Sequence, residues 1–253
     1  MKKIVLALAL IAFLAACSSQ EPNAETPTIT VLTSPDYPPY ESVATDGSYE
    51  GFDIELMEAL AAKMSVTVVW KEQAFDGIIA AIQSSQGDMA ISGMNVSEER
   101  LKSVDFSDIY KADGNLYTAV VKKEDGFSSI TDLTGKIIGV QTGTVQEGAM
   151  NGIASKYSLT VSSQKAFATI IEDIKLDRVD ALVIDSTNAS TYAEQDDSLM
   201  TFELTDEALS GKAGTAIAFP KGSEWVEKVN TALAELDADG TLAQLDAKWF
   251  PAQ

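Results

Sequence analysis

Apolar residues along the chain are spaced alternately as in strands and as in helices. Between positions 52 and 64 they recur every four residues, which predicts one face of a helix. Short runs rich in β-branched residues flank this segment and predict strands. The expected strands are 28–33, 66–70, 89–91, 116–121, 137–140, 159–162, 181–184 and 213–219. The expected helices are 52–64, 75–83, 145–155, 167–176, 225–236 and 241–249.

The order of these elements predicts an α/β fold with largely parallel sheets, because strands alternate with helices. In open sheets of this kind, ligands bind beyond the carboxyl ends of the strands. Segments 87–92 and 179–185 each run from an acid through a short apolar strand to a polar residue. Two such units would each direct a polar side chain into one shared crevice.

The N-terminus has the pattern of a secretory signal peptide. Two lysines precede an apolar run, 4–14, which is about half the length of a bilayer-spanning helix. Residues 14–17 resemble a bacterial lipobox, in which Cys17 is acylated and becomes the first residue of the mature chain. An ordinary signal peptide, cleaved at small residues, is the alternative. Cys17 is the only cysteine, so the chain has no disulfide framework.

The segment that follows Cys17 predicts a flexible tether. Residues 17–27 are mostly Ser, Gln, Glu, Pro, Asn and Thr, a composition that does not form a packed core. About 225 residues remain, which is enough for a sizeable core in one large or two small domains. No later apolar run approaches the length of a membrane span.

Charge and composition exclude several classes of function. The chain has 18 basic and 38 acidic residues, and loss of the two lysines at positions 2 and 3 leaves 16 against 38, a net charge of −22. Such a surface repels nucleic acid and anionic lipid. The chain has no histidine, which excludes catalytic Ser–His and Cys–His pairs and imidazole metal sites. A calcium-binding loop motif is also missing, so we expect no metal and no cofactor.

Three segments have chemistry suited to the head group of an α-amino acid. Segment 92–100 predicts a strand end, a glycine turn and a helix start, and its Arg100 can bind a carboxylate bidentately, with Ser92 and backbone N–H groups assisting. Segment 141–144 joins a strand to a helix whose N-terminus favours anions. Asp185 follows an apolar strand and can hold an ammonium group. Each residue also has a structural interpretation: a surface arginine, a capping threonine and a capping aspartate.

An aromatic cluster lies at or just after the end of the first strand. It consists of Tyr37, Tyr40 and Phe52. If Tyr37 and Phe52 face each other, they can enclose an apolar stem or stack on a cation. Core packing is the alternative, and it is favoured for Tyr40.

The chain resembles the polar amino-acid family of periplasmic-type solute-binding proteins, family 3, in its lipoprotein form. No single motif is specific, but the set occurs in the family's order over nearly the whole mature chain. The similar segments are 37–41, 51–56, 75–79, 91–94, 99–100, 104–108, 140–144, 179–181, 239–241 and 248–250.

This resemblance implies a type II periplasmic-binding-protein fold with two α/β lobes. Each lobe would have a mostly parallel sheet flanked by helices, and two hinge strands near 110–114 and 211–215 would let the lobes close on a ligand. Lobe one would comprise 28–110 and 214–253, and lobe two 114–212. The signal peptide would comprise 1–16.

The resemblance also implies roles for individual residues. Arg100 would bind the ligand carboxylate, assisted by Ser92, Gly93, Asn95 and Thr144. Asp185 would bind the ammonium group, and the rings would be Tyr37 and Phe52. Asn95 stands where the family usually has Thr, and Ser34 stands where several relatives have an Asp that binds the ligand side chain. Other residues that could reach the ligand side chain are Asp36, Glu41, Gln141 and Gln146.

The resulting expectation is a monomeric, extracytoplasmic binding protein anchored to the membrane by lipid on Cys17. It would bind a free L-amino acid and deliver it to the membrane subunits of an ABC importer. Arginine is the first expected ligand, followed by lysine or histidine, and glutamine or another neutral polar amino acid is the alternative. An acidic ligand fits least, because the motifs contain no second basic residue. The remaining alternative is a dehydratase-type enzyme on the same fold.

Overall fold

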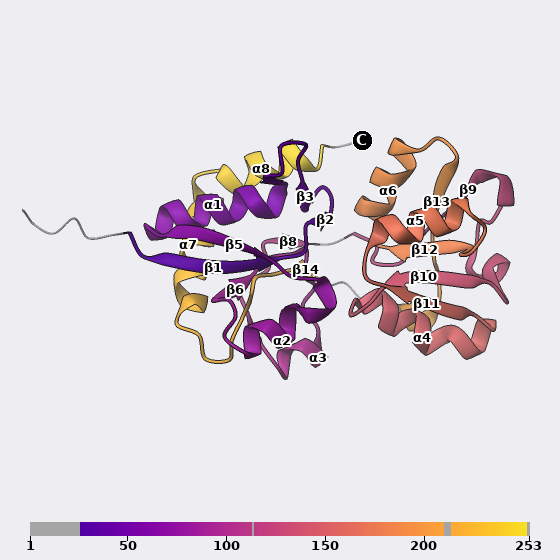
Figure 1. Ribbon diagram of the computed structural model, residues 1–253, viewed down its shortest axis with the longest axis horizontal. Coiled ribbons are helices and arrows are strands. Elements are labelled where there is room, and N and C mark those ends of the chain that lie inside the picture. Colours follow the sequence, from indigo (N-terminus) through magenta and orange to yellow (C-terminus); the bar gives the residue numbers. More distant parts are fainter. Residues whose placement is uncertain (1–25, 113, 210–213, 252–253) are drawn as a thin grey trace, which may run out of the picture.

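The computed structural model describes residues 26–112, 114–209 and 214–251. These residues form two lobes, each with a five-stranded sheet and helices packed on it, which confirms the predicted fold class (Figure 1). Among them, no helix is both long and apolar enough to cross a bilayer. The predicted signal peptide, Cys17 and most of the predicted tether lie outside the described residues.

Lobe one is built on a sheet with strand order β5-β1-β6-β15-β7. Strand β1 is parallel to β5 and β6, whereas β15 is antiparallel to β6 and β7. The strands are β1 (Thr28–Thr33), β5 (Thr67–Glu72), β6 (Met89–Ala90), β7 (Asp105–Phe106) and β15 (Ala218–Phe219). The helices are α1 (Phe52–Met64), α2 (Ile78–Gln83), α3 (Glu98–Leu101), α7 (Trp225–Ala238) and α8 (Thr241–Trp249).

Both faces of the lobe-one sheet are buried. Neighbouring residues of β1 point to opposite faces: Val31 packs in the cluster with α1 and α7, and Leu32 packs in the cluster with α2. This explains why two neighbouring residues of the strand, Val31 and Leu32, are both apolar, although their side chains point to opposite faces.

Lobe two has a sheet with strand order β11-β10-β12-β9-β13. Strand β10 is parallel to β11 and β12, and β9 is antiparallel to β12 and β13. The strands are β9 (Thr118–Lys122), β10 (Ile137–Gln141), β11 (Thr160–Gln164), β12 (Ala181–Ile184) and β13 (Leu199–Glu203). The helices are α4 (Val145–Tyr157), α5 (Phe167–Lys175) and α6 (Ser186–Gln195). Strand β13 and helix α6 were not predicted from the sequence.

Two small sheets lie outside the lobe sheets. Strands β8 (Lys111–Ala112) and β14 (Gly214–Thr215) pair antiparallel where the chain passes between the lobes, so the single strand predicted over 213–219 is in fact β14 and β15. Strands β2 (Asp36–Tyr37), β3 (Glu41–Val43) and β4 (Tyr49–Glu50) form a three-stranded sheet next to α1. The hinge positions and exact lobe limits stay predictions, since residues 113 and 210–213 lie outside the described part.

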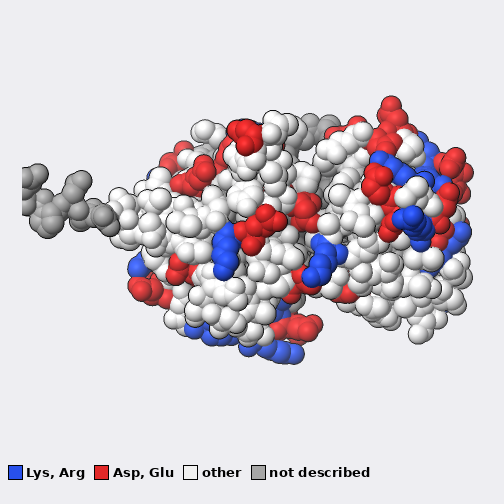
Figure 2. All heavy atoms as spheres, viewed as in Figure 1, with Lys and Arg blue, Asp and Glu red and all other residues white. Residues whose placement is uncertain are grey.

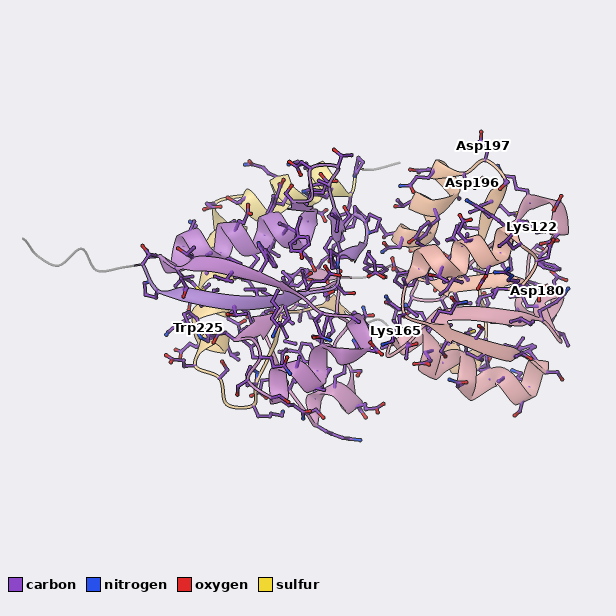
Figure 3. All side chains as sticks on the ribbon, in the orientation of Figure 1. Lys122, Lys165, Asp180, Asp196, Asp197 and Trp225 are labelled. Carbon is purple, nitrogen blue, oxygen red and sulfur yellow. The ribbon has the colours of Figure 1, made fainter. Side chains whose placement is uncertain are left out.

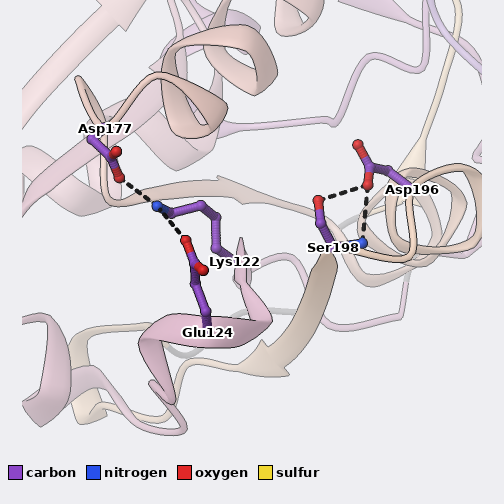
Figure 4. Close-up of polar contacts among 5 residues, drawn as sticks. All are labelled: Lys122, Glu124, Asp177, Asp196 and Ser198. Atoms are coloured by element: carbon purple, nitrogen blue, oxygen red, sulfur yellow. Dashed lines mark hydrogen bonds and ion pairs between the residues drawn. The ribbon is translucent and has the colours of Figure 1, made fainter.

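Charged side chains gather at the end of lobe two that is remote from lobe one (Figures 2 and 3). There Lys122 pairs with Asp177 and with Glu124, the latter at 3.0 Å, and the hydrogen bond to Asp177 is the main cause that raises the pKa of Lys122. Nearby, Asp196 accepts hydrogen bonds from the amide and hydroxyl of Ser198 at 3.0 and 2.6 Å (Figure 4). Exposed contacts of this kind contribute little to stability, because solvent screens their charges.

We expect Leu60→Ala to lower the free energy of unfolding by about 2–5 kcal/mol, because truncation leaves a cavity in the lobe-one core. Leu60 is 0% exposed on the buried face of α1. The matched control is Leu176→Ala, whose side chain is 55% exposed and which should change stability little. Chemical denaturation measures both variants, and equal losses would contradict this view of the core.

Candidate functional site

A pocket between the lobes is lined by residues from both of them. Lobe one contributes side chains from β2, β3, α3 and the segments after β5 and β6, and lobe two contributes residues at the ends of β10 and β11. The lining residues are Asp36, Tyr37, Glu41, Phe75, Gly93, Asn95, Arg100, Gln141, Thr144, Gln146 and Phe167. Of the residues predicted to bind ligand, the pocket includes Tyr37, Gly93, Asn95, Arg100, Gln141, Thr144 and Gln146.

Arg100 joins the two lobes by hydrogen bonds to backbone carbonyls. Its Nη1 donates to the Asn95 oxygen at 2.6 Å, and its Nη2 donates to the Gly143 oxygen of lobe two at 2.9 Å. The guanidinium carbon lies 5.3 Å from the centroid of the Phe75 ring. Among the described residues, no carboxylate forms an ion pair with Arg100. Burial therefore dominates and lowers the pKa of Arg100 to about 10, while nearby Glu99 acts in the opposite direction.

Such a guanidinium favours an anionic partner. It is largely removed from water, and carbonyl dipoles only partly compensate its charge. Two of its five N–H groups are used in the bonds to Asn95 and Gly143, and the other donors can bind a carboxylate. Arg100 is therefore a half-buried residue of the pocket wall and not a fully exposed surface arginine.

The N-terminus of α4 forms the lobe-two side of the pocket. Thr144 is its N-cap: the hydroxyl oxygen accepts the Glu147 amide at 3.2 Å and donates to the Gln141 carbonyl at 2.7 Å. The capping interpretation is thus correct, and Thr144 still lines the pocket. The partial positive charge of the helix N-terminus adds to that of Arg100.

Asp185 lies at the end of β12, where it caps α6. Its Oδ1 accepts the amides of Thr187 and Asn188, both at 3.1 Å, and its Oδ2 accepts the Asn188 side-chain amide at 2.9 Å and the hydroxyl of Tyr37 from lobe one. Burial raises the pKa of Asp185, and these bonds offset the effect in part. The Tyr37 hydroxyl thus takes the position on the carboxylate where an ammonium group is expected, and Asp185 does not line the pocket.

Phe52 lies outside the pocket, so the prediction that it faces Tyr37 is wrong. It is 1% exposed, and its ring packs in the lobe-one core 5.2 Å from Phe250 and 6.0 Å from Tyr110. Phe52 begins α1, and the buried face of this helix directs its side chain into the core. The rings stacked on Tyr37 belong to Phe167, at 5.2 Å between centroids and an interplanar angle of 23°, and to Tyr40, at 5.5 Å and 11°.

The pocket aromatics Phe75 and Phe167 were not among the predicted site residues. Each begins a helical segment shortly after a strand, Phe75 after β5 and Phe167 after β11. Asp185 was predicted as a site residue because ligands bind beyond the carboxyl ends of strands in an α/β sheet, and the same reasoning applies to these two positions. The sequence therefore contained a signal that could have identified Phe75 and Phe167.

Ser34 and Ser92 support the site from behind instead of lining it. The Ser92 hydroxyl donates to Glu41 Oε1 at 2.9 Å and accepts the Ser34 amide at 3.1 Å. The Ser34 hydroxyl donates to Asp36 Oδ1 at 3.1 Å. The Gly93 amide donates to Asp53 Oδ2 at 2.7 Å, so it points away from the pocket as well.

Only glycine fits at position 93. Its φ is +51°, and a Cβ there would lie 2.8 Å from Cδ1 of Tyr37. The close approach of backbone and ring fixes Tyr37 at the wall of the pocket.

A pair of buried acids, Glu41 and Asp53, lies beneath this loop. Both are 0% exposed, and Asp53 also accepts the Tyr110 hydroxyl at 2.9 Å. Burial raises the pKa of Asp53 to about 7 and that of Glu41 more strongly, since Asp53 also repels its charge. Glu41 Oε2 and Asp53 Oδ1 have no donor among the described groups. One proton held by Glu41 and donated to Asp53 satisfies both oxygens.

Fold and site together define a two-lobed solute-binding protein with the type II periplasmic-binding-protein fold. Residues 29–252 match the bacterial extracellular solute-binding proteins, family 3. The chain is 38% identical over 255 residues to the arginine-binding extracellular protein ArtP of Bacillus subtilis (strain 168), covering 99% of this chain and 98% of that protein. The chain belongs to this family.

Solved structures of similar proteins have the same fold. An ancestral arginine-binding protein bound to arginine has a TM-score of 0.81 and 39% identity, over 88% of this chain and 98% of that chain. An ancestral arginine-binding protein bound to glutamine has a TM-score of 0.80 and 39% identity, over 89% and 98% of the two chains. The recognition of the family from sequence motifs is thereby confirmed.

The acid pair predicts a specific pH dependence of stability. The pKa of Asp53 is about 7 in the folded protein and about 4 in the unfolded chain. Between these values the folded state keeps a proton that the unfolded state has released, so the free energy of unfolding falls as pH rises through this interval.

Asp53→Asn removes this titration, and the new amide N–H can donate to Glu41 in place of the proton that Glu41 donates to Asp53 in the wild type. The free energy of unfolding of the variant minus that of the wild type should therefore increase from pH 4 to pH 7 and level off above pH 7. Denaturation curves recorded across this range measure it. A difference independent of pH would show that Asp53 is already ionised when folded.

Proposed function

We propose that this protein captures a free α-amino acid outside the cytoplasm and delivers it to the membrane subunits of an ABC importer. The observation that carries the proposal is the half-buried Arg100 guanidinium, which has no ion-pair partner among the described residues and lies in a pocket shared by both lobes. A ligand carboxylate supplies the missing countercharge. The extracellular solute-binding family to which the chain belongs supports the same role.

The ligand's head group is assigned to three elements. Arg100 and the N-terminus of α4 at Thr144 bind the carboxylate. Asp185 binds the ammonium group after the Tyr37 hydroxyl moves away from its Oδ2. Because Arg100 and Asp185 lie in different lobes, a zwitterion is bound best when the lobes are closed, as in a hinge mechanism.

The side-chain end of the pocket favours a cationic amino acid, with arginine first and lysine or histidine next. The acid Asp36 lines this part of the pocket together with the rings of Tyr37, Phe75 and Phe167. A planar guanidinium stacks well on such rings. The arginine-binding relatives support this order.

Glutamine is the second candidate ligand. Two amide side chains, Gln141 and Gln146, line the pocket and can bond an amide group. A solved structure of similar fold is bound to glutamine.

The cellular arrangement completes the proposal. Lipid on Cys17 anchors a monomer to the membrane, and residues 17–27 serve as the tether that lets it reach the importer. Ligand is released chemically unchanged, which distinguishes this role from that of a dehydratase on the same fold.

Arg100→Ala should weaken binding about a hundred- to several-thousandfold, because the carboxylate loses its buried counter-charge, a loss of about 3–5 kcal/mol. The matched control is Arg178→Ala, which removes the exposed arginine that pairs with Asp173 on lobe two. Isothermal titration calorimetry with arginine measures both variants. A loss below tenfold for Arg100→Ala, or an equal loss in the control, would contradict the assignment.

The ligand class is tested by titrating the wild type with arginine, lysine, histidine, glutamine and glutamate. We expect one site per chain, tightest binding of arginine and weakest binding of glutamate, since Arg100 is the only basic side chain among the described residues that line the pocket. Chromatography of the recovered ligand should show it intact. Tight binding of glutamine with no binding of arginine would replace the cationic ligand by a neutral one, and conversion of any ligand would indicate an enzyme.

A further inference from the structure

Asp36 occupies an unusual position among the acids of lobe one. It lies in β2, lines the ligand pocket and contacts lobe two directly. Its Oδ1 accepts the Ser34 hydroxyl at 3.1 Å, and its Oδ2 accepts the side-chain amide of Gln141 at 3.1 Å. The backbone N–H of Phe167, at the start of α5, also donates to the Asp36 carboxylate.

The surroundings of Asp36 leave its charge poorly compensated. The donors from Ser34, Gln141 and Phe167 are neutral, and burial outweighs them and raises the pKa of Asp36. Lys165, the nearby lysine at the lobe junction (Figure 3), pairs with Asp76 at 3.8 Å instead. Arg100 donates to carbonyls of Asn95 and Gly143.

Glu41, the second acid in the pocket wall, differs from Asp36. It is completely buried, it is held by the Ser92 hydroxyl, and its pKa is raised by burial and by repulsion from Asp53. Glu41 is therefore the acid that keeps its proton. Asp36 is the pocket acid that presents negative charge to a ligand.

We propose that Asp36 selects the charge of the ligand side chain, favouring a guanidinium or ammonium group over a neutral group of the same shape. This inference rests on the proposed function, because it concerns the same pocket. Ser34, Gln141 and the backbone N–H groups of Phe167 and of Asp36 itself all donate to this carboxylate, so a charged N–H of a ligand replaces or shares the place of one of four neutral donors. A cation relieves the uncompensated charge in this low-dielectric site, and a neutral ligand does not.

Gln141 acts as a positioning residue for Asp36. Its Nε2 donates both to Asp36 Oδ2 and to the Lys165 carbonyl at 3.0 Å, which fixes the amide between the lobes. The ring of Phe167 stacks on Tyr37 next to the same carboxylate. A flat cation that bonds Asp36 therefore lies close to aromatic surface.

The test compares arginine with citrulline, which has the same shape but an uncharged urea group. In Asp36→Asn, the affinity for arginine should fall about ten- to hundredfold, the effect of losing a charged hydrogen bond, and the affinity for citrulline should change by less than about threefold. Titration calorimetry measures both ligands. If the asparagine variant is unstable in a thermal melt, Asp36→Ser gives the same comparison.

The matched control is Asp76→Asn, which removes an acid at the lobe junction that does not line the pocket. Both affinities should stay as in the wild type. Equal losses for arginine and citrulline in Asp36→Asn would show that Asp36 only holds the lobes together, and would overturn the inference while the proposed function stands. A wild type that binds citrulline as tightly as arginine would overturn both the inference and the cationic ligand class.

Discussion

The central constraint in this structure is the placement of one half-buried positive charge between two lobes. Arg100 belongs to lobe one, yet its guanidinium reaches the Gly143 carbonyl of lobe two and stacks on Phe75. Carbonyl dipoles only partly replace the water that the charge has lost. The site is therefore organised around an anion, and the α4 N-terminus adds positive potential from the other side.

The pocket wall depends on a second layer of polar contacts. Glu41 and Asp53 hold the Ser92 hydroxyl and the Gly93 amide, and the absence of a side chain at Gly93 lets Tyr37 pack against the backbone. The residues that the sequence motifs assigned to the ligand therefore fall into two groups. Those of the first group line the pocket, and those of the second group hold in place the loop that forms the pocket wall.

The spacing of apolar residues in the sequence predicted the α/β class and most of the long elements, because a helix such as α1 that buries one face repeats its apolar residues every three to four positions, and buried strands are short runs rich in β-branched and apolar residues. It did not reveal that β9 and β15 run antiparallel to their neighbours. The direction of a strand follows from how the chain returns between lobes, and local spacing contains no information about that path. Helix α6 has few apolar residues, so its periodicity was too weak to detect.

The sequence by itself determined several of the segments that reach the pocket, since the polar residues at strand ends of an α/β sheet converge on one edge. It identified Arg100, Thr144 and Gln141 in this way. Only the tertiary structure decided which side chains at those ends face the pocket: Phe52 turns into the core, Phe75 and Phe167 supply rings, and Ser92 points to Glu41. The physical reason is that side-chain direction depends on packing against residues distant in the chain, which spacing along the sequence does not specify.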